Sequence, residues 1–117
     1  MISALHSALS GLTAFAKSVA VTAHNVANVA TSEFKRSRTE FREAADGGVR
    51  TSVAVDGKPG SRIQQDAARG SALVEQSNVD PGEEMVNLLA ARREFSLNVS
   101  VVKTTDEMLG TLVNLRK

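Results

Sequence analysis

Apolar residues recur at helical spacing near both ends of this 117-residue chain, and the stretch between them is polar and rich in turn formers. The first series advances by steps of three and four, which places its side chains on one face of a helix. Its members are Ile2, Leu5, Leu9, Leu12, Ala16, Val19, Ala23, Val26 and Ala30. The series predicts one helix over residues 1–30, with a heptad seam suited to packing on another helix.

The second series predicts another long helix, over residues 79–117. Its members are Met85, Leu88, Arg92, Phe95, Val99, Val102, Asp106, Leu109 and Val113. Asp80 is a typical N-cap, Pro81 suits the first helical position, and Glu83 completes the pattern of a capping box. Because each helix carries an apolar seam, we expect the two to pair as a coiled-coil-like hairpin.

The middle of the chain, residues 31–78, predicts loop and a short β segment. Positions alternate over Val49–Val55 as they do in a strand with one buried face. A turn at residues 56–60 would lead to a partner strand near residues 62–65, and residues 71–76 are a candidate for a second extended piece. The expected fold is a single, mainly α domain of two paired helices with one short β-hairpin between them.

The first helix carries almost no charge. Lys17 is the only Lys or Arg in residues 1–30, and no Asp or Glu occurs there. A helix exposed to water would normally carry charges on its outer face. Two interpretations follow: a core helix of a small bundle, or a helix packed among copies of itself or its relatives. The chain has only four Phe and no Trp or Tyr, so large buried anchors are scarce and association is a usual remedy.

Composition argues against several kinds of function. The net charge is +1, from 14 basic and 13 acidic residues. Glu33, Glu40 and Glu43 are interleaved with the basic residues of 35–42, so no nucleic-acid surface is expected. Cysteine is absent, and His6 and His24 lie about 27 Å apart on one helix, too far to share a metal ion. No phosphate-binding glycine loop, membrane span or cleavable signal pattern occurs. We expect no catalytic residue, cofactor or metal.

Two charges interrupt the second seam. Arg92 and Asp106 lie about 21 Å apart along the helix and cannot pair with each other. Either each meets a partner on another helix and fixes its register, or both lie at the edge of the seam and reach solvent.

Two sets of short motifs stand out in the sequence, one toward each end of the chain. The N-terminal set is Ala8-Leu9-Ser10-Gly11-Leu12, His24-Asn25-Val26-Ala27-Asn28 and Thr31-x-x-Phe34-Lys35-Arg36. The C-terminal set is Ser77-Asn78-Val79-Asp80, Glu83-Glu84-Met85-Val86-Asn87-Leu88, Arg93-x-Phe95-x-x-Asn98 and Lys103-Thr104-x-Asp106-Glu107-Met108-Leu109. Both sets resemble motifs of the bacterial flagellar basal-body rod and hook proteins. They stand in that family's order and cover about 70 of the 117 residues.

The resemblance implies a structural role without catalysis. Members of this family are axial proteins whose paired terminal helices stack helically into the inner tube of the rod or hook. The flagellar type III apparatus exports them unfolded, without signal cleavage. By resemblance, this chain is a subunit of the basal-body rod outside the cytoplasm. Its implied partners are itself, other rod and hook proteins and, in transit, the export apparatus, with no direct membrane insertion. The alternative is a non-polymerising factor that docks on rod-protein helices.

The residues expected to carry this role fall into two groups. The assembly seam comprises Leu5, Leu9, Leu12, Val19, Val26, Met85, Leu88, Phe95, Val99, Val102 and Leu109. The polar residues of the family motifs are Asn25, Asn28, Asn78, Asn98 and Asp106. Asn25 and Asn28 match the family's Asn pair near the end of the first helix, where their amides would satisfy backbone groups.

The chain departs from the family pattern in two places. Ala30, Ser32 and Glu33 stand where the family usually has Asn, Pro and Gly, and Glu33 resists the left-handed turn that glycine permits. We therefore expect a different turn after the first helix, or a continued helix. The middle is also short, which favours a proximal-rod type, whereas residues 77–109 read closer to distal-rod members.

Overall fold

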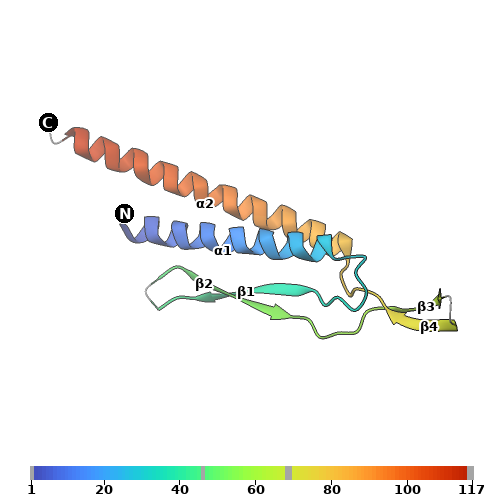
Figure 1. Ribbon diagram of the computed structural model, residues 1–117. Coiled ribbons are helices and arrows are strands. Elements are labelled where there is room, and N and C mark those ends of the chain that lie inside the picture. The colour runs from blue at the N-terminus through green and yellow to red at the C-terminus, as the bar shows by residue number, and fades with distance from the viewer. Residues whose placement is uncertain (1, 46, 68–69, 116–117) are drawn as a thin grey trace.

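The computed structural model describes residues 2–45, 47–67 and 70–115, which form two long helices and two β-hairpins (Figure 1). The helices are α1, Ile2–Ala27, and α2, Pro81–Leu115. The strands are β1, Ser37–Glu43; β2, Val49–Val55; β3, Arg62–Ala67; and β4, Gly70–Glu75. Both predicted helices therefore exist. Residue 1 and residues 116–117, at the ends of the predicted ranges, lie outside the described residues.

The start of α2 has the expected cap. The Asp80 carboxylate accepts hydrogen bonds from the backbone N–H groups of Gly82 and Glu83, at 2.7 and 3.2 Å. Pro81 is the first helical residue. The Glu83 side chain pairs with Arg36 instead of reaching back to the N-cap. The sequence thus predicted where α2 begins, while the second half of the capping box serves a tertiary contact.

After the first helix we expected either a different turn, because Glu33 resists the left-handed conformation, or a continued helix. The helix does not continue, and Glu33 adopts the conformation that it was expected to resist. The helix ends at Ala27, and a turn follows in which Glu33 adopts a φ of 61°, the left-handed conformation that favours glycine. The Glu33 N–H donates to the Glu75 carbonyl at 2.9 Å. That backbone bond, made to a distant segment, holds Glu33 in a conformation that its own side chain disfavours.

The predicted hairpin over residues 49–65 is wrong. β2 pairs antiparallel with β1 on its N-terminal side, from Ser37 opposite Val55 to Glu43 opposite Val49. β3 pairs antiparallel with β4, from Arg62 opposite Glu75 to Ala67 opposite Gly70. The turn between β1 and β2 contains Gly47 and Gly48, both with positive φ. The chain reverses there, and not at residues 56–60.

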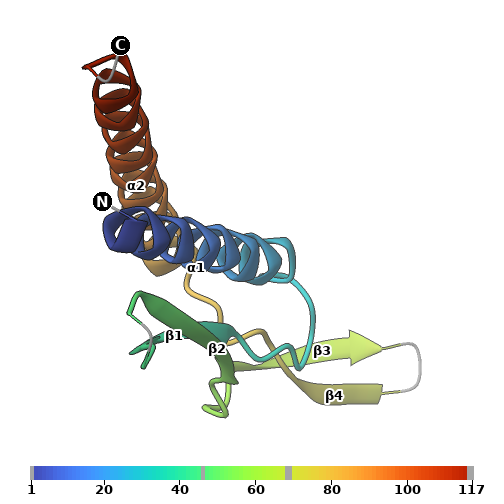
Figure 2. The ribbon, with the colours of Figure 1, turned by 90° about the vertical axis from the view of Figure 1, so that its left-hand side faces the viewer.

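The helices do not form the predicted coiled coil. They run antiparallel, yet their axes diverge toward the N- and C-terminal ends of the chain (Figures 1 and 2). The buried residues of α1 are Ala8, Gly11, Ala14, Thr22 and Asn25, and none of them belongs to the predicted seam. The expectation of a mainly α domain with a coiled-coil-like helix hairpin and one β-hairpin is therefore wrong. Two small antiparallel sheets accompany the helices instead.

The molecule is long and thin, with α1 lying between α2 and the β1–β2 hairpin, while the β3–β4 hairpin extends beyond the helices (Figure 1). Its extents are 82 × 24 × 17 Å. The radius of gyration is 20.9 Å, against about 13 Å for a compact domain of this length. Among the described residues, the buried hydrophobic side chains are three alanines and one valine, Ala8, Ala14, Ala91 and Val79. The chain alone therefore has a very small core.

Candidate functional site: exposed helix faces and a polar joint

The predicted assembly seam divides into two parts in the structure. Leu5, Leu12 and the half-buried Leu109 line a mostly apolar groove of about 310 Å³ where α1 and α2 diverge. Val99 and Val102 complete its apolar wall. Val19 and Leu88 are half-buried elsewhere. The remaining members are exposed: Leu9, Val26, Met85 and Phe95. The structure thus brings together part of the seam and leaves the rest on the surface.

Small and polar side chains meet where Gly11 of α1 approaches Asn98 of α2. A β-carbon at Gly11 would lie 2.9 Å from the Asn98 side-chain oxygen, so a larger residue there would require the Asn98 side chain to shift. Asn98 donates to the Glu94 carbonyl at 2.9 Å, which fixes its amide against α2. Ala8, Ala14 and Ala91 are buried nearby on the two helices. Sequence reasoning followed the larger apolar residues and missed this face, whose signal was small residues at spacing three.

A network of polar contacts, called the polar joint below, attaches the β1–β2 hairpin to the end of α1. It begins at Asn25 and Ser37 and includes the contacts of Lys35, Arg36 and Asn78. Asn25 is 1% exposed, and its amide makes two hydrogen bonds to the backbone of Ser37. Its nitrogen donates to the Ser37 carbonyl at 2.7 Å, and its oxygen accepts from the Ser37 N–H at 2.9 Å. The Asn25 amide thereby pairs with the Ser37 backbone as the backbone of a neighbouring strand would. Asn28 instead donates to the His24 carbonyl at 2.9 Å, which satisfies an end group of α1.

Arg36 links three segments at this joint. Its guanidinium pairs with Asp56 at 3.2 Å and with Glu83 at 2.5 Å. The pKa of Arg36 is raised, chiefly by the hydrogen bond to Glu83. The pKa of Asp56 is lowered, chiefly by the Lys58 backbone N–H and further by Arg36. Arg36 thereby links the residue that follows β2 to the first turn of α2.

Asn78 and Lys35 complete the joint. The Asn78 oxygen accepts from the Arg36 N–H at 2.7 Å, and its nitrogen donates to the carbonyls of Asp56 and Lys58, at 3.0 and 2.8 Å. Lys35 pairs with Glu75 at the base of the β3–β4 hairpin. The pKa of Glu75 is lowered by Lys35 first and by the Gly60 N–H second. Sequence spacing gave no signal for these pairs, because their partners lie 15 to 42 positions apart.

The two charges that interrupt the second seam are both exposed. Asp106 lies at the rim of the apolar groove beside Lys103. Arg92 lies on the surface of α2. Within this chain both therefore reach solvent. Of the histidines, His24 packs edge-on against Phe34 with ring centroids 5.5 Å apart, and His6 is exposed near the other end of α1.

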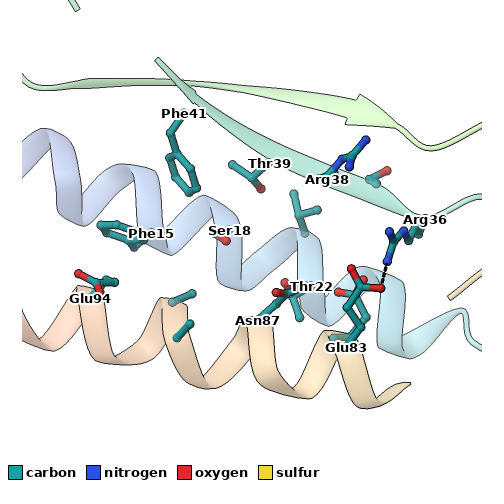
Figure 3. A pocket seen from close by; sticks show the side chains of 15 residues that line it. Phe15, Ser18, Thr22, Arg36, Arg38, Thr39, Phe41, Glu83, Asn87 and Glu94 are labelled. Atoms are coloured by element: carbon teal, nitrogen blue, oxygen red, sulfur yellow. Dashed lines mark hydrogen bonds and ion pairs between the residues drawn. The ribbon is translucent and has the colours of Figure 1, made fainter. Parts of the chain in front are cut away.

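A cavity of about 340 Å³ lies between α1, α2 and β1. Figure 3 shows Phe15 and Phe41 toward one end and the Arg36–Glu83 pair at the other. The two rings are 5.4 Å apart between centroids and hold β1 against α1. Glu84, which the sequence analysis quoted only as part of a C-terminal motif, lines this cavity and is only 3% exposed.

The described residues were compared with two common kinds of functional feature, a metal site and a membrane-spanning helix. Within residues 2–45, 47–67 and 70–115, no three His, Asp or Glu side chains are grouped as a metal site would require. In the same residues, no helix is long and apolar enough to cross a membrane. The outstanding features are the exposed apolar side chains of the helices and the joint that fixes the hairpins to them.

Both ends of the chain match families of known proteins. Residues 5–35 match the family described as "Flagella basal body rod protein". Residues 71–115 match the family described as "Flagellar basal body rod FlgEFG protein C-terminal". The first match contains α1 and the start of the joint, and the second contains β4 and α2.

Individual relatives match the same regions. The flagellar hook protein FlgE of Escherichia coli K12 is 49% identical over 46 residues, which are 39% of this chain and 11% of that protein. FlgE of Salmonella typhimurium LT2 is 42% identical over 64 residues, 55% of this chain and 15% of that protein. The flagellar basal-body rod protein FlgG of Borreliella burgdorferi is 35% identical over 77 residues, 66% of this chain and 27% of that protein.

The chain therefore spans between about a tenth and about a quarter of the length of these relatives. The two family matches lie at its two ends and in the order in which the resembling motifs stand. On these matches, the chain belongs to the flagellar basal-body rod and hook protein family.

Proposed function

We propose that this chain is a structural subunit of the flagellar basal-body rod that assembles helically through the outer faces of α1 and α2. It has no catalytic role. Its partners are copies of itself and other rod and hook proteins, and its place is the basal body outside the cytoplasm, reached through the flagellar export apparatus. Family membership supports the axial role, and the helix surfaces support the mode of assembly.

The observation that carries the proposal is the amount of apolar side chain left uncovered on the helices. On α1, Ile2 is 83% and Leu9 59% exposed. α2 exposes apolar residues along its whole length: Met85, Val86, Leu89, Leu97, Val101, Met108, Leu112, Val113 and Leu115. Soluble monomers rarely expose continuous apolar surface on this scale. These faces are suited to contact with neighbouring subunits.

Magnitudes favour association. Burying one large apolar side chain completely contributes about 1.5–3 kcal/mol. The exposed residues named above are partly covered already, so each has less to gain, but their contributions add up against an association cost of about 4–15 kcal/mol. Contacts through α1 would bury or oppose few charges, because Lys17 is its only Lys or Arg and it has no Asp or Glu. The polar joint contributes by fixing both helices relative to the hairpins before assembly.

The test is incorporation into the basal body. In the source bacterium, deletion of the gene should abolish swimming, and the wild-type chain should restore it and co-purify with isolated basal bodies. Leu9→Glu introduces a charge on an exposed face of α1 and should prevent incorporation while the purified chain keeps its helix content. Ser52→Glu, at an exposed polar position of β2, is the matched control and should incorporate normally.

Two results would contradict the proposal. A deletion strain that swims normally would exclude a rod role. Recovery of the chain only in a stable, soluble 1:1 complex with a rod protein would instead support a factor that docks on rod-protein helices without polymerising.

A further inference from the structure

α1 carries an exposed series of residues on the side opposite its buried residues. The series advances by steps of four and three, so its members lie on one face of the helix. They are Ile2, His6, Leu9, Thr13, Ala16, Ala20, Ala23 and Ala27, and every one is exposed. Half of them are alanines, whose small side chains let a neighbouring helix approach closely. We call this series the α1 outer face.

α2 carries a series of matching length, which we call the α2 outer face. Its members are Ala90, Glu94, Leu97, Val101, Thr104, Met108, Leu112 and Leu115, and all of them are exposed. The first series runs from residue 2 to residue 27 and this one from residue 90 to residue 115, so each extends about 38 Å along its helix. Large side chains predominate on the α2 outer face. The two faces therefore agree in length and complement each other in side-chain size.

The other exposed flank of α2 is less suited to a contact with α1. Phe95 lies on this flank, but three charged residues surround it, Arg92, Lys103 and Asp106. Covering them with the nearly uncharged α1 would remove them from water without counter-charges, which is costly. On the α2 outer face, Glu94 is the single charged residue.

Charge indicates which faces pair. Lys17 borders the α1 outer face and is the only Lys or Arg of α1, which has no Asp or Glu. Neither Lys17 nor Glu94 forms an ion pair among the described residues. Two α1 outer faces in contact would present a lysine on each side, and two α2 outer faces would present a glutamate on each side. An α1 face against an α2 face presents opposite charges, which favours this pairing over both alternatives.

We propose that, in the assembly, the α1 outer face of one copy packs along the α2 outer face of a second copy, with Lys17 of the first beside Glu94 of the second. This inference rests on the proposed function and specifies which helix faces meet. Because the two faces lie on different helices, the contact is heterologous. A pair of copies still has one α1 outer face and one α2 outer face free, so a row of subunits can grow at both ends.

Charge exchange tests the pairing. Lys17→Glu and Glu94→Lys should each reduce the amount of chain in purified basal bodies about tenfold or more, because each places like charges in the contact. The two changes combined in one chain should restore incorporation, because opposite charges meet again. Glu107→Lys, at an exposed position on another side of α2, is the matched control and should incorporate as the wild type does. All the purified variants should melt as the wild type does, because neither charge is paired within the chain.

Cysteine cross-linking tests the heterologous geometry. The chain has no cysteine, so Lys17→Cys and Glu94→Cys each introduce a single thiol. Mild oxidation of basal bodies that contain the double cysteine variant should give a ladder of covalent multimers, because each copy can be joined to two others. Each single cysteine variant should remain monomeric on a denaturing gel.

Several results would overturn the inference. Normal incorporation of both single charge variants would do so, as would failure of the combined exchange to restore incorporation. Cross-linked dimers in a single cysteine variant would show like faces in contact. A melting temperature that falls in parallel with incorporation would assign Lys17 or Glu94 to the fold of the single chain, again against the pair. A wild-type chain absent from basal bodies would instead overturn the proposed function itself.

Discussion

The two β-hairpins have similar lengths and the same antiparallel pairing, but they have opposite surroundings. β1–β2 lies along α1, where Phe41 meets Phe15 and the Val49 N–H donates to the Ser10 hydroxyl at 3.0 Å. β3–β4 contacts neither helix nor the other sheet through its described strands (Figure 1). An isolated two-stranded hairpin is at best marginally stable in water. The first hairpin is therefore part of the fold of the subunit, whereas the second depends on its base.

The difference shows which contacts replace a core in this thin molecule. β1–β2 is held by buried hydrogen bonds and one aromatic pair, and Gly48 allows its turn to approach α1 so closely that a β-carbon there would lie 2.3 Å from the Ser10 hydroxyl. β3–β4 is held at its base by the Lys35–Glu75 pair and by the backbone bond from Glu33 to Glu75. The attachment of β1–β2 depends on buried contacts, so its stability should be sensitive to mutation. The attachment of β3–β4 depends largely on an ion pair, so it should be sensitive to pH.

Removal of Asn25 should have the largest effect. Asn25→Ala leaves the N–H and the carbonyl of the half-buried Ser37 without partners, which should cost about 3 kcal/mol of unfolding free energy. Urea unfolding measures the loss, and amide exchange should accelerate in β1 more than in β4. Asn28→Ala is the matched control, because Asn28 lies at the surface end of α1, and it should cost less than about 1 kcal/mol. Equal losses in the two variants would contradict the importance of the buried joint.

Truncation of one apolar side chain in each hairpin compares their attachments directly. Phe41→Ala removes the contact with Phe15 and should cost about 1–1.5 kcal/mol, less than for a fully buried ring because Phe41 is 45% exposed. Leu73→Ala changes a residue of β4 that is 73% exposed and should alter stability by less than about 0.5 kcal/mol. Thermal unfolding of the two purified variants is the measurement. A larger loss for Leu73→Ala would mean that β3–β4 packs on part of the chain after all.

Acid should loosen the base of β3–β4. The pKa of Glu75 in the folded chain lies below its ordinary value of 4.5, chiefly because Lys35 donates to its carboxylate. A lowered pKa stabilises the fold above pH 4.5, and the contribution is lost as the pH falls through the folded-state pKa. The Gly60 N–H, which donates to Glu75 at 2.9 Å, can report this titration by NMR. Its midpoint should lie below 4.5 and rise in Lys35→Met; a midpoint at or above 4.5 in the wild type would exclude the pairing.

The smallest effect is expected where the chain turns toward the base of β3–β4. Glu33 has a φ of 61°, so Glu33→Gly removes a strained conformation while adding backbone freedom to the unfolded chain. The net result should be a gain of about 0.5 kcal/mol, measured by urea unfolding. Glu33→Ala keeps a β-carbon and should give no such gain. A clear destabilisation by glycine would mean that the Glu33 side chain makes a contribution that outweighs the strain.

The sequence predicted the helices well because each has a long and regular apolar series, and Asp80 marked the beginning of α2. It did not predict which face of each helix meets the other. Periodicity alone cannot separate a face that packs within the chain from a face that packs on a neighbour, and the larger residues such as Leu9 and Met85 are exposed. The intrachain contact uses Gly11 and alanines, whose small size gives a weak hydrophobic signal.

β1 was missed for a related reason. Its alternation is carried by Ser37, Thr39 and Phe41, with charged residues between them, so its apolar signal is a single aromatic ring. The strand pairs because its backbone is held by Asn25 and its ring by Phe15, two residues on a different element. Of the polar joint, the motifs pointed to Asn25 and Asn78, whereas the pairs of Arg36 and Lys35 depend on contacts between distant segments that only the folded chain reveals.

The central claim is that neighbouring subunits cover the exposed apolar faces of α1 and α2. The chain has no cysteine, so Leu9→Cys and Leu89→Cys each introduce a single thiol at an exposed position of one helix. A maleimide reagent should label both variants readily in the purified chain and at least about tenfold more slowly in isolated basal bodies. Ser52→Cys on β2 serves as the control for general access. Equal labelling of Leu9→Cys and Leu89→Cys in the two states would contradict assembly through these faces.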